Sequence, residues 1–420
     1  MTVDSTTLDG WFKDRYEAEG RELVPEFSDL GTSIPFRAGD MQLGNRYTFN
    51  VRVRRAHGMT WGGSAANAFT LNDVRSGQTV DGQQSSYQAV LREQVAYGVV
   101  SRAQSSREAF GNAFDEVVRD MTNAMGFYRE LNLLYGGSSI GTITAGGLGS
   151  VTSATITITP ATWAAGLWAQ MEGAAVDVYS APGGTQRNTN AAVVIAGVDF
   201  TNRQVDITGN ASDINAITAA DVIIPFEADT NWFDGLDVLV PNTSVSVHGI
   251  NPATYGLWQG NSIGAGSAAL TFATVNATAG RIASRGGMGK LICRVSPLTW
   301  ADLNDDLAAL RRYAAAVKSE ADLGTQSLKF YSQTGELEIR PHPMVKAGEA
   351  FVTMDSYFKR IGSTDISFRL PGVQGQQPRF FRELDGTAAF ELRGWWDQAL
   401  VTFKPACHAK ITGIVNSQSV

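Results

Sequence analysis

The residue types that most often carry out chemistry in proteins are few and scattered along this sequence. Its four histidines are His57, His248, His342 and His408. None has a ligand partner at the spacing that a metal site uses, so we expect no metal. His342 stands between two prolines, where a surface or packing role is the usual one. Cys293 lies within an apolar stretch, which favours a buried structural thiol.

Three carboxylates, Asp302, Asp305 and Asp306, resemble the paired acids of an acid–base catalyst. They fall in the first turns of a helix expected after Pro297, where the helix dipole favours negative charge, so we expect a structural role. The sequence has no nucleophile elbow, no Walker loop and no glycine-rich turn that opens a helix. We therefore expect no catalytic residue and no cofactor.

One charged feature stands out, a cluster of arginines formed by Arg46, Arg52, Arg54 and Arg55. It could be the solvated face of a hairpin, or it could pair with carboxylates of another subunit, since arginine forms bidentate pairs with them. Nucleic acid is the weakest alternative, because no aromatic residues alternate with the arginines. The net charge of −7 and the isoelectric point near 5.3 also argue against a general nucleic-acid surface.

An alternating pattern positions these arginines. Tyr47, Phe49, Val51 and Val53 alternate with polar residues, which predicts a half-buried strand over 46–56. Residues 59–82 have no clear period, so we expect a loop that projects from the body and gains its contacts on a neighbouring subunit. Residues 87–103 are expected to be the returning strand, which makes 46–100 an extended hairpin. Within the loop we add Trp61 and Phe69 as contact candidates.

A long amphipathic helix is predicted to follow the hairpin. Apolar residues recur every three or four positions from Phe110 to Tyr135, and Gly136 and Gly137 end the run. Glu130 is among the polar residues that fall between them. Counted from about Ser105, this helix would span roughly 30 residues, or about 45 Å.

The rest of the chain divides by texture. Residues 1–45 are a polar arm that needs a surface to lie on, and its Trp11 and Phe12 are further contact candidates. Residues 151–226 predict several short strands, a small barrel or sandwich. From 229 onward we expect mixed α/β structure, with helices over 272–282 and 300–317 and a strand over 290–295. Strands are expected at 328–331, 337–340, 350–354, 366–370, 389–393 and 399–403.

Composition agrees with a folded protein of two or three modules. The chain has 420 residues, of which 43% are hydrophobic and 18% charged. We see no signal peptide and no apolar run long enough to cross a membrane, so we expect a soluble protein made in a reducing cytoplasm.

Five local sequences, in this order, resemble the major capsid proteins of tailed bacteriophages, the Hong Kong 97-type fold that encapsulins share. They are AFGNAF at 109–114, LNLLYG at 131–136, GINPATYGLW at 249–258, PLTWADL at 297–303 and KITGI at 410–414. The resemblance covers nearly the whole chain. It implies an α+β fold with six parts: the arm (1–45), an extended E-loop (46–103), the spine helix of the peripheral P domain (104–150), an inserted β-domain (151–226), an axial A domain (227–345) and closing strands that return to the P domain (346–420).

The resemblance also implies a function. The chain would assemble with itself as hexamers and pentamers into an icosahedral virion shell, made in the host bacterial cytoplasm, that encloses double-stranded DNA without sequence-specific binding. Its partners would be portal and scaffolding proteins, with a decoration protein as a further possibility, and no membrane. Scaffolding would come from a separate protein, or a longer precursor would have been cleaved. On maturation the spine helix would straighten and the E-loop would settle.

One departure from the family concerns cross-linking. Some members join subunits through an isopeptide bond from an E-loop lysine, but this chain has no lysine between Lys13 and Lys290. We expect non-covalent contacts instead. An encapsulin-like compartment stays open as an alternative, and so, with less support, does a β-rich sugar-binding or tail protein.

Overall fold

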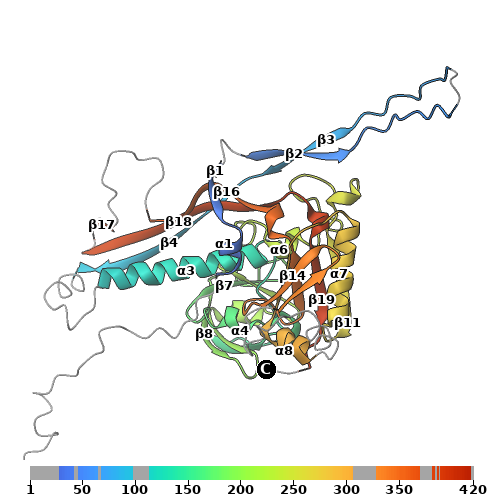
Figure 1. Ribbon diagram of the computed structural model, residues 1–420. Helices are drawn as coiled ribbons and strands as arrows, with labels where there is room; N and C mark the ends of the chain where they lie inside the picture. The colour runs from blue at the N-terminus through green and yellow to red at the C-terminus, as the bar shows by residue number, and fades with distance from the viewer. Residues whose placement is uncertain are drawn as a thin grey trace, which may run out of the picture.

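The computed structural model describes residues 28–41, 46–64, 68–97, 113–305, 328–368, 381–383, 386 and 388–417. Three sets of residues named in the predictions lie outside these ranges. They are Trp11 and Phe12, the first residues expected in the long helix, and residues 306–317 of the helix expected at 300–317. In the described part, a long helix and a sheet extend to one side of a dense body, and a hairpin projects from the other side (Figure 1).

The long helix is α3, Ala113–Tyr135. Met121, Met125, Leu131 and Tyr135 are buried on the predicted apolar stripe. The helix runs along strands β4 and β18 (Figure 1). Gly136 follows it because the backbone of the 233–235 segment approaches closely: a Cβ at this position would lie 1.9 Å from the carbonyl oxygen of Phe233.

The sheet above α3 combines distant parts of the chain. Its strands are β1 (Phe36–Met41), β4 (Tyr87–Ala96), β16 (Phe358–Ser367), β17 (Phe381–Glu383) and β18 (Ala389–Thr402). The order is β1-β16-β18-β17, and β4 also pairs with β18. Three expectations were wrong here. The two strands expected at 389–393 and 399–403 are one strand, the strand expected at 366–370 runs from 358 to 367, and β4 belongs to this sheet rather than to the hairpin.

The hairpin consists of β2 (Tyr47–Arg54) and β3 (Gln78–Gln84), which pair antiparallel. The returning strand is therefore β3, not the stretch 87–103. The sequence hid it because Gln, Thr, Asp and Gly give β3 little apolar alternation. Beyond the paired strands, the His57 amide still donates to the Arg75 carbonyl at 2.9 Å, so the two arms stay together as they leave the body (Figure 1).

The β-rich stretch forms a closed six-stranded barrel. Its strands are β5 (Gly141–Thr142), β6 (Ser153–Thr157), β7 (Ala175–Tyr179), β8 (Val193–Asp199), β9 (Gln204–Thr208) and β10 (Val222–Pro225). The order is β5-β10-β7-β8-β9-β6, and a bridge between Ile143 and Ile158 joins the two ends. Of the two predicted alternatives, the barrel is confirmed. It starts before residue 151, because β5 takes part.

A second large sheet forms the rest of the body. Its order is β11 (Asn261–Ala268), β19 (Ala409–Ile414), β15 (Glu349–Thr353), β12 (Leu291–Val295), β14 (Gly335–Pro341) and β13 (Leu328–Ser332). Helix α7, Phe272–Ser284, and the strand at 291–295 confirm their predictions. Burial raises the pKa of the Cys293 thiol to about 12, in keeping with a structural role. The segment 346–420 supplies strands to both large sheets.

Short helices complete the fold: α1 (Leu30–Ser33), α4 (Ala165–Trp168), α5 (Ala211–Asn215), α6 (Leu236–Leu239) and α8 (Pro297–Asp305), with 3-10 turns η2 (Pro160–Thr162), η3 (Gly256–Trp258), η4 (Asp355–Tyr357) and η5 (Pro405–Cys407). The hydrophobic cores of the barrel and of the helix α3 region are continuous, and the second large sheet and α7 enclose another.

A buried carboxylate on α3 fastens several of these parts together. Glu130 is fully buried, although the sequence placed it among the polar positions between the apolar ones. It accepts hydrogen bonds from the amides of Asp29 (3.2 Å), Leu30 (2.7 Å) and Gly31 (3.0 Å), at the start of α1. His342 Nε2 lies 3.1 Å away. Burial alone would raise the pKa of Glu130, but these hydrogen bonds outweigh it and hold the pKa below its usual value.

A buried arginine fastens the same segment from the other side. Arg294 of β12 is fully buried and bonds to Asp29, to Ser33 (3.0 Å) and to Asp355 (2.6 Å). Burial alone would lower its pKa, but the carboxylates of Asp355 and Asp29 outweigh it and raise the pKa instead. The part of the arm around α1 is thus held between α3 and the second large sheet.

Replacing Glu130 tests this arrangement. Glu130→Gln removes the charge and leaves buried amide donors facing an amide group, so we expect the free energy of unfolding to fall by about 2–4 kcal/mol. Urea denaturation followed by tryptophan fluorescence measures it. The control is Glu336→Gln, which breaks a half-exposed 3.8 Å ion pair with Lys290 and should change stability by less than about 1 kcal/mol. Equal losses in the two variants would contradict the role of Glu130.

Candidate functional site

The arginine cluster lies on the near part of the hairpin. Arg52, Arg54 and Arg55 are exposed, and among the described residues none has a carboxylate within ion-pair distance. Arg46 is exposed as well and donates to Gln83 Oε1 at 3.1 Å. The structure therefore brings the four arginines onto one projecting element and leaves three of their charges without a partner in the described chain.

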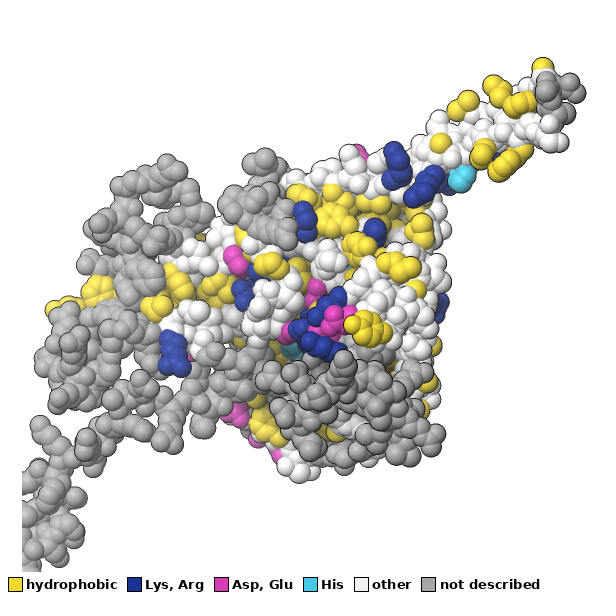
Figure 2. Space-filling view, viewed as in Figure 1, with side chains coloured by type: hydrophobic (Ala, Val, Ile, Leu, Met, Phe, Trp, Pro, Cys, Tyr) yellow, Lys and Arg dark blue, Asp and Glu magenta, His cyan; other side chains and the backbone are white. Residues whose placement is uncertain are grey.

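The far part of the hairpin, the hairpin tip (residues 57–64 and 68–75), carries exposed apolar side chains. They are Met59 (69% exposed), Trp61 (81%), Phe69 (55%), Leu71 (76%) and Val74 (89%). Figure 2 shows hydrophobic side chains gathered along the outer end of the hairpin, with Lys and Arg side chains nearer the body. Both candidates from the sequence, Trp61 and Phe69, are in this group, and the other three were missed because the loop shows no periodicity.

The tip has local order despite its exposure. The Asn72 amide donates to Thr60 Oγ1 at 2.9 Å, and its side-chain nitrogen donates to the Met59 carbonyl at 3.1 Å. The Phe69 ring lies directly over Gly62, where a Cβ would come within 2.5 Å of it. The apolar side chains are thus displayed on a defined backbone rather than being buried by it.

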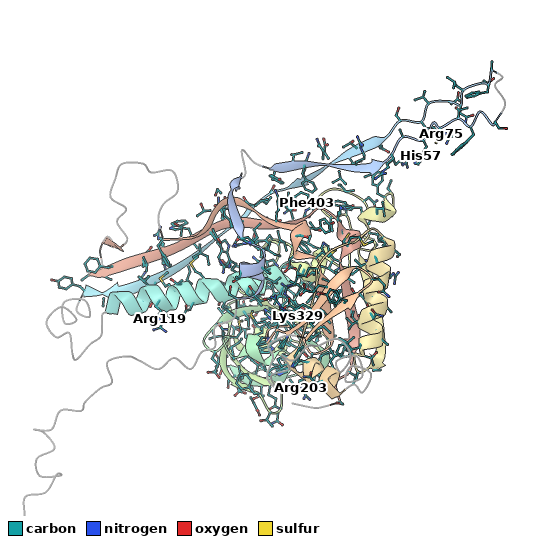
Figure 3. All side chains as sticks on the ribbon, viewed as in Figure 1. His57, Arg75, Arg119, Arg203, Lys329 and Phe403 are labelled. Atoms are coloured by element: carbon teal, nitrogen blue, oxygen red, sulfur yellow. The ribbon has the colours of Figure 1, made fainter. Side chains whose placement is uncertain are left out.

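The root of the hairpin packs on an aromatic cluster of the body. Phe49 is buried, and its ring centroid lies 5.0 Å from that of Phe403, 5.8 Å from that of His248 and 6.4 Å from that of Trp258. Gly82 faces Phe49 across the hairpin and leaves room for its ring. Figure 3 shows Phe403 beneath the root of the hairpin, and His57 and Arg75 farther out on the hairpin.

His248 joins the hairpin to the body by hydrogen bonds. Its Nδ1 lies 2.9 Å from Gln84 Oε1, and the Thr402 amide donates to its Nε2 at 3.2 Å. Its carbonyl accepts from the Gln83 amide at 2.9 Å. Burial lowers the pKa of His248 to about 4. Nothing in the sequence marked this residue, because its partners are far away in the chain.

The body carries a groove that is lined in part by aromatic side chains. It has a volume of about 480 Å³ and lies between α3, β4, β18 and the segment after β10. Its lining includes the aromatic residues Tyr87, Tyr128, Phe226, Trp232 and Trp396. Further along the same two elements lie two carboxylates, Glu93 on β4 and Asp120 on α3. Burial and the nearby Asp120 carboxylate raise the pKa of Glu93, since both disfavour its charged form.

The described ranges contain no group of three or more His, Cys, Asp or Glu side chains that could hold a metal ion. Across the same ranges, none of the helices combines the length and the apolar character that crossing a membrane requires.

Comparison with known proteins gives a likeness in structure but not in sequence. No protein-family model matches the chain, and no curated protein matches it significantly. Among solved structures, the capsid of cyanophage A-1(L) is similar with a TM-score of 0.54 at 13% identity, over 98% of this chain and 99% of that one. Capsid chains of native and of empty gene transfer agent (GTA) particles each give a TM-score of 0.52 at 7% identity, over 99% of this chain and 100% of theirs.

These likenesses span both chains almost end to end, so they concern the whole architecture rather than one domain. The chain has an α+β fold of the Hong Kong 97 type, the fold of these phage and gene transfer agent capsid proteins. The resemblance in the five local sequences predicted this fold.

The hairpin separates residues that hold the chain together from residues that face outward, and substitution should show the difference. Phe49→Ala empties the root and should lower the free energy of opening of β2 and β3 by about 3 kcal/mol. Trp61→Ala should change it by less than about 0.5 kcal/mol, because the side chain is mostly in solvent. Amide hydrogen exchange of the β2 and β3 peptides in the unassembled protein measures both. A large loss in Trp61→Ala would mean that the tip packs on its own body.

Proposed function

We propose that this chain is the major capsid protein of a tailed-phage-like particle, the subunit that repeats to form an icosahedral shell. The observation that carries the proposal is the hairpin, which displays large apolar side chains and three arginines without a carboxylate partner among the described residues, while its root is firmly packed. Exposed apolar side chains gathered on one projecting element are typical of an interaction site. The capsid fold, matched along the whole chain, supports the same conclusion.

In this proposal the parts take the roles that the fold implies. The sheet of β1, β4, β16, β17 and β18, with α3, forms the peripheral domain. The second large sheet forms most of the axial domain, and the barrel is an insertion between them. Axial domains would meet at the centres of hexamers and pentamers. Repeated head-to-tail contacts of this kind close into rings and then into a shell.

The hairpin would lie on a neighbouring subunit. Arg52, Arg54 and Arg55 would pair with carboxylates there, while Trp61 and Phe69 would cover apolar surface, and Arg46 would support the stem. The groove beside α3 offers aromatic side chains, and the Glu93 and Asp120 carboxylates lie further along β4 and α3. Each contact can be modest, because several contacts per subunit add up to a stable shell. Trp11 and Phe12 remain contact candidates of the arm.

The shell would enclose double-stranded DNA without reading its sequence, in keeping with a net charge of −7. Portal and scaffolding proteins would be its assembly partners, in the host cytoplasm, before the particle becomes a virion. The absence of lysine between Lys13 and Lys290 rules out an E-loop isopeptide bond from that stretch, so non-covalent contacts or a decoration protein would stabilise the shell.

Charge reversal on the hairpin tests the proposed contact. The double variant Arg52→Glu, Arg54→Glu should lower the assembled fraction at least tenfold, because like charges would face Glu93 and Asp120. Restoring opposite charges with Glu93→Arg in the same chain should recover part of that assembly. Sedimentation velocity of the purified chain measures the assembled fraction.

Arg281→Glu, an exposed arginine on α7, is the matched control and should assemble like the wild type. If reversal at Arg52 and Arg54 leaves assembly intact, the hairpin arginines are simply solvated. The contents of purified particles distinguish a phage-type shell from an encapsulin-like compartment. Double-stranded DNA would support the phage-type shell, whereas enzyme cargo would indicate an encapsulin-like compartment.

A further inference from the structure

The root of the projecting hairpin contains a hydrogen-bond arrangement that only a neutral imidazole can satisfy. We propose that His248 is an acid-sensitive latch, which holds the hairpin to the body when it is neutral and releases it when it is protonated. The latch is a property of the single chain. Only its consequence for a shell rests on the proposed function.

His248 occupies a tight turn between distant parts of the fold. Val247 and Ile250 bond to each other across the turn, and His248 and Gly249 both have positive φ angles, 53° and 78°. This backbone aims the ring between β3 of the hairpin and β18 of the body. The two ring nitrogens then bond to one element each, Nδ1 to Gln84 at 2.9 Å and Nε2 to Thr402 at 3.2 Å.

The partners dictate where the proton sits. The group that Thr402 presents is a backbone N–H, which can only donate, so Nε2 must be the nitrogen with the lone pair. On the other side, the Gln84 side-chain nitrogen donates to the Ser85 carbonyl at 3.0 Å, which turns Gln84 Oε1 toward the ring. Nδ1 therefore carries the hydrogen and donates to Gln84. Protonation of Nε2 would place a second N–H against the Thr402 N–H and break the contact.

The surroundings disfavour the charged form. Phe49 of β2, Trp258 of η3 and Phe403 after β18 supply rings around the site. Among the charged groups on the neighbouring elements, Arg46 bonds to Gln83, and Lys359 Nζ lies 5.7 Å from the Phe403 ring centroid. Asp81 of β3 alternates with Gly82, which faces Phe49, and so lies on the other face of the hairpin. The carboxylates of β18, Glu391 and Asp397, bond to Arg393 and Ser363. Tyr47 lies beside Phe49. His248 is the titratable group whose two ring nitrogens bond to both elements, and the ordinary pKa of a histidine lies between pH 4 and pH 7.

The direction of the pH effect follows from burial. The pKa of His248 falls from 6.5 to about 4 when the latch is closed, so the closed state binds fewer protons than the open state. The latch is therefore fully effective above about pH 6.5 and weakens as the pH falls toward 4. At pH 4 its closing equilibrium should be about 100-fold less favourable than at pH 7. Phe49 and the 3.3 Å contact between Gln78 and Tyr255 would still tether the released root.

Amide hydrogen exchange of the unassembled chain, corrected for the intrinsic pH dependence of exchange, tests the latch. The amides of Gln83 and Thr402 should lose about 100-fold of their protection between pH 7 and pH 4. His248→Asn is the matched variant, because asparagine tolerates a positive φ and does not titrate. In this variant, the protection of the Gln83 and Thr402 amides should change by less than about threefold between pH 7 and pH 4.

A second histidine separates this effect from general acid unfolding. His408 is fully buried in the body, where burial lowers its pKa to about 3, and its Nδ1 bonds to the Met354 amide. By the same linkage, opening around His408 also becomes easier at pH 4, so the Met354 amide should lose protection equally in the wild type and in His248→Asn, whereas the loss at Gln83 and Thr402 should occur in the wild type alone. If His248→Asn folds poorly, His248→Gln serves for the same comparison. Protection of Gln83 and Thr402 that does not depend on pH in the wild type, or that falls equally in the variants, would overturn the latch while leaving the proposed shell untouched.

Discussion

The buried carboxylate of Glu130 needs hydrogen-bond donors inside the molecule, and this constraint organises the parts around it. Three consecutive amides at the start of α1 and the imidazole of His342 meet there, so α3, the part of the arm around α1 and the turn following β14 are held at one point. Arg294 holds the same segment from β12. Removing one partner of such a buried network leaves the others unpaired, so separating these parts of the body is costly.

A body fixed in this way can carry an element that is not stabilised by its own burial. Among the described residues, the hairpin is attached near its root, through the Phe49 ring, the His248 hydrogen bonds and the Gln78–Tyr255 contact, and its outer half keeps Trp61, Phe69 and their neighbours in solvent. Exposing these apolar side chains to water is unfavourable in an isolated chain, and the proposed contact with a second copy of the chain would bury them. The same division places His248 where the projecting hairpin meets the body, so that in the proposed latch its protonation would loosen the hairpin root without loosening Glu130.

The parts of this structure that could be predicted from the sequence are those with regular spacing. The stripe from Phe110 to Tyr135, the alternation from Tyr47 to Val53 and the helix at 272–282 all report burial through local periodicity. Strand β3 escaped notice because Val80 is its one large apolar side chain and gives no visible alternation. Strand β18 looked like two strands because Gly394, Trp395 and Trp396 interrupt its alternation. Glu130, His248 and Arg294 could not be recognised, since their partners lie roughly 60 to 270 residues away in the chain.

The central claim is that this chain builds a shell from copies of itself. Electron microscopy of the purified chain, expressed alone and together with a candidate scaffolding protein, tests it most directly. The account predicts closed shells, or rings of five and six subunits, in which each hairpin reaches over a neighbouring subunit. A monodisperse species no larger than a monomer or dimer under both conditions would contradict it, and would leave the exposed hairpin without the partner for which its surface is suited.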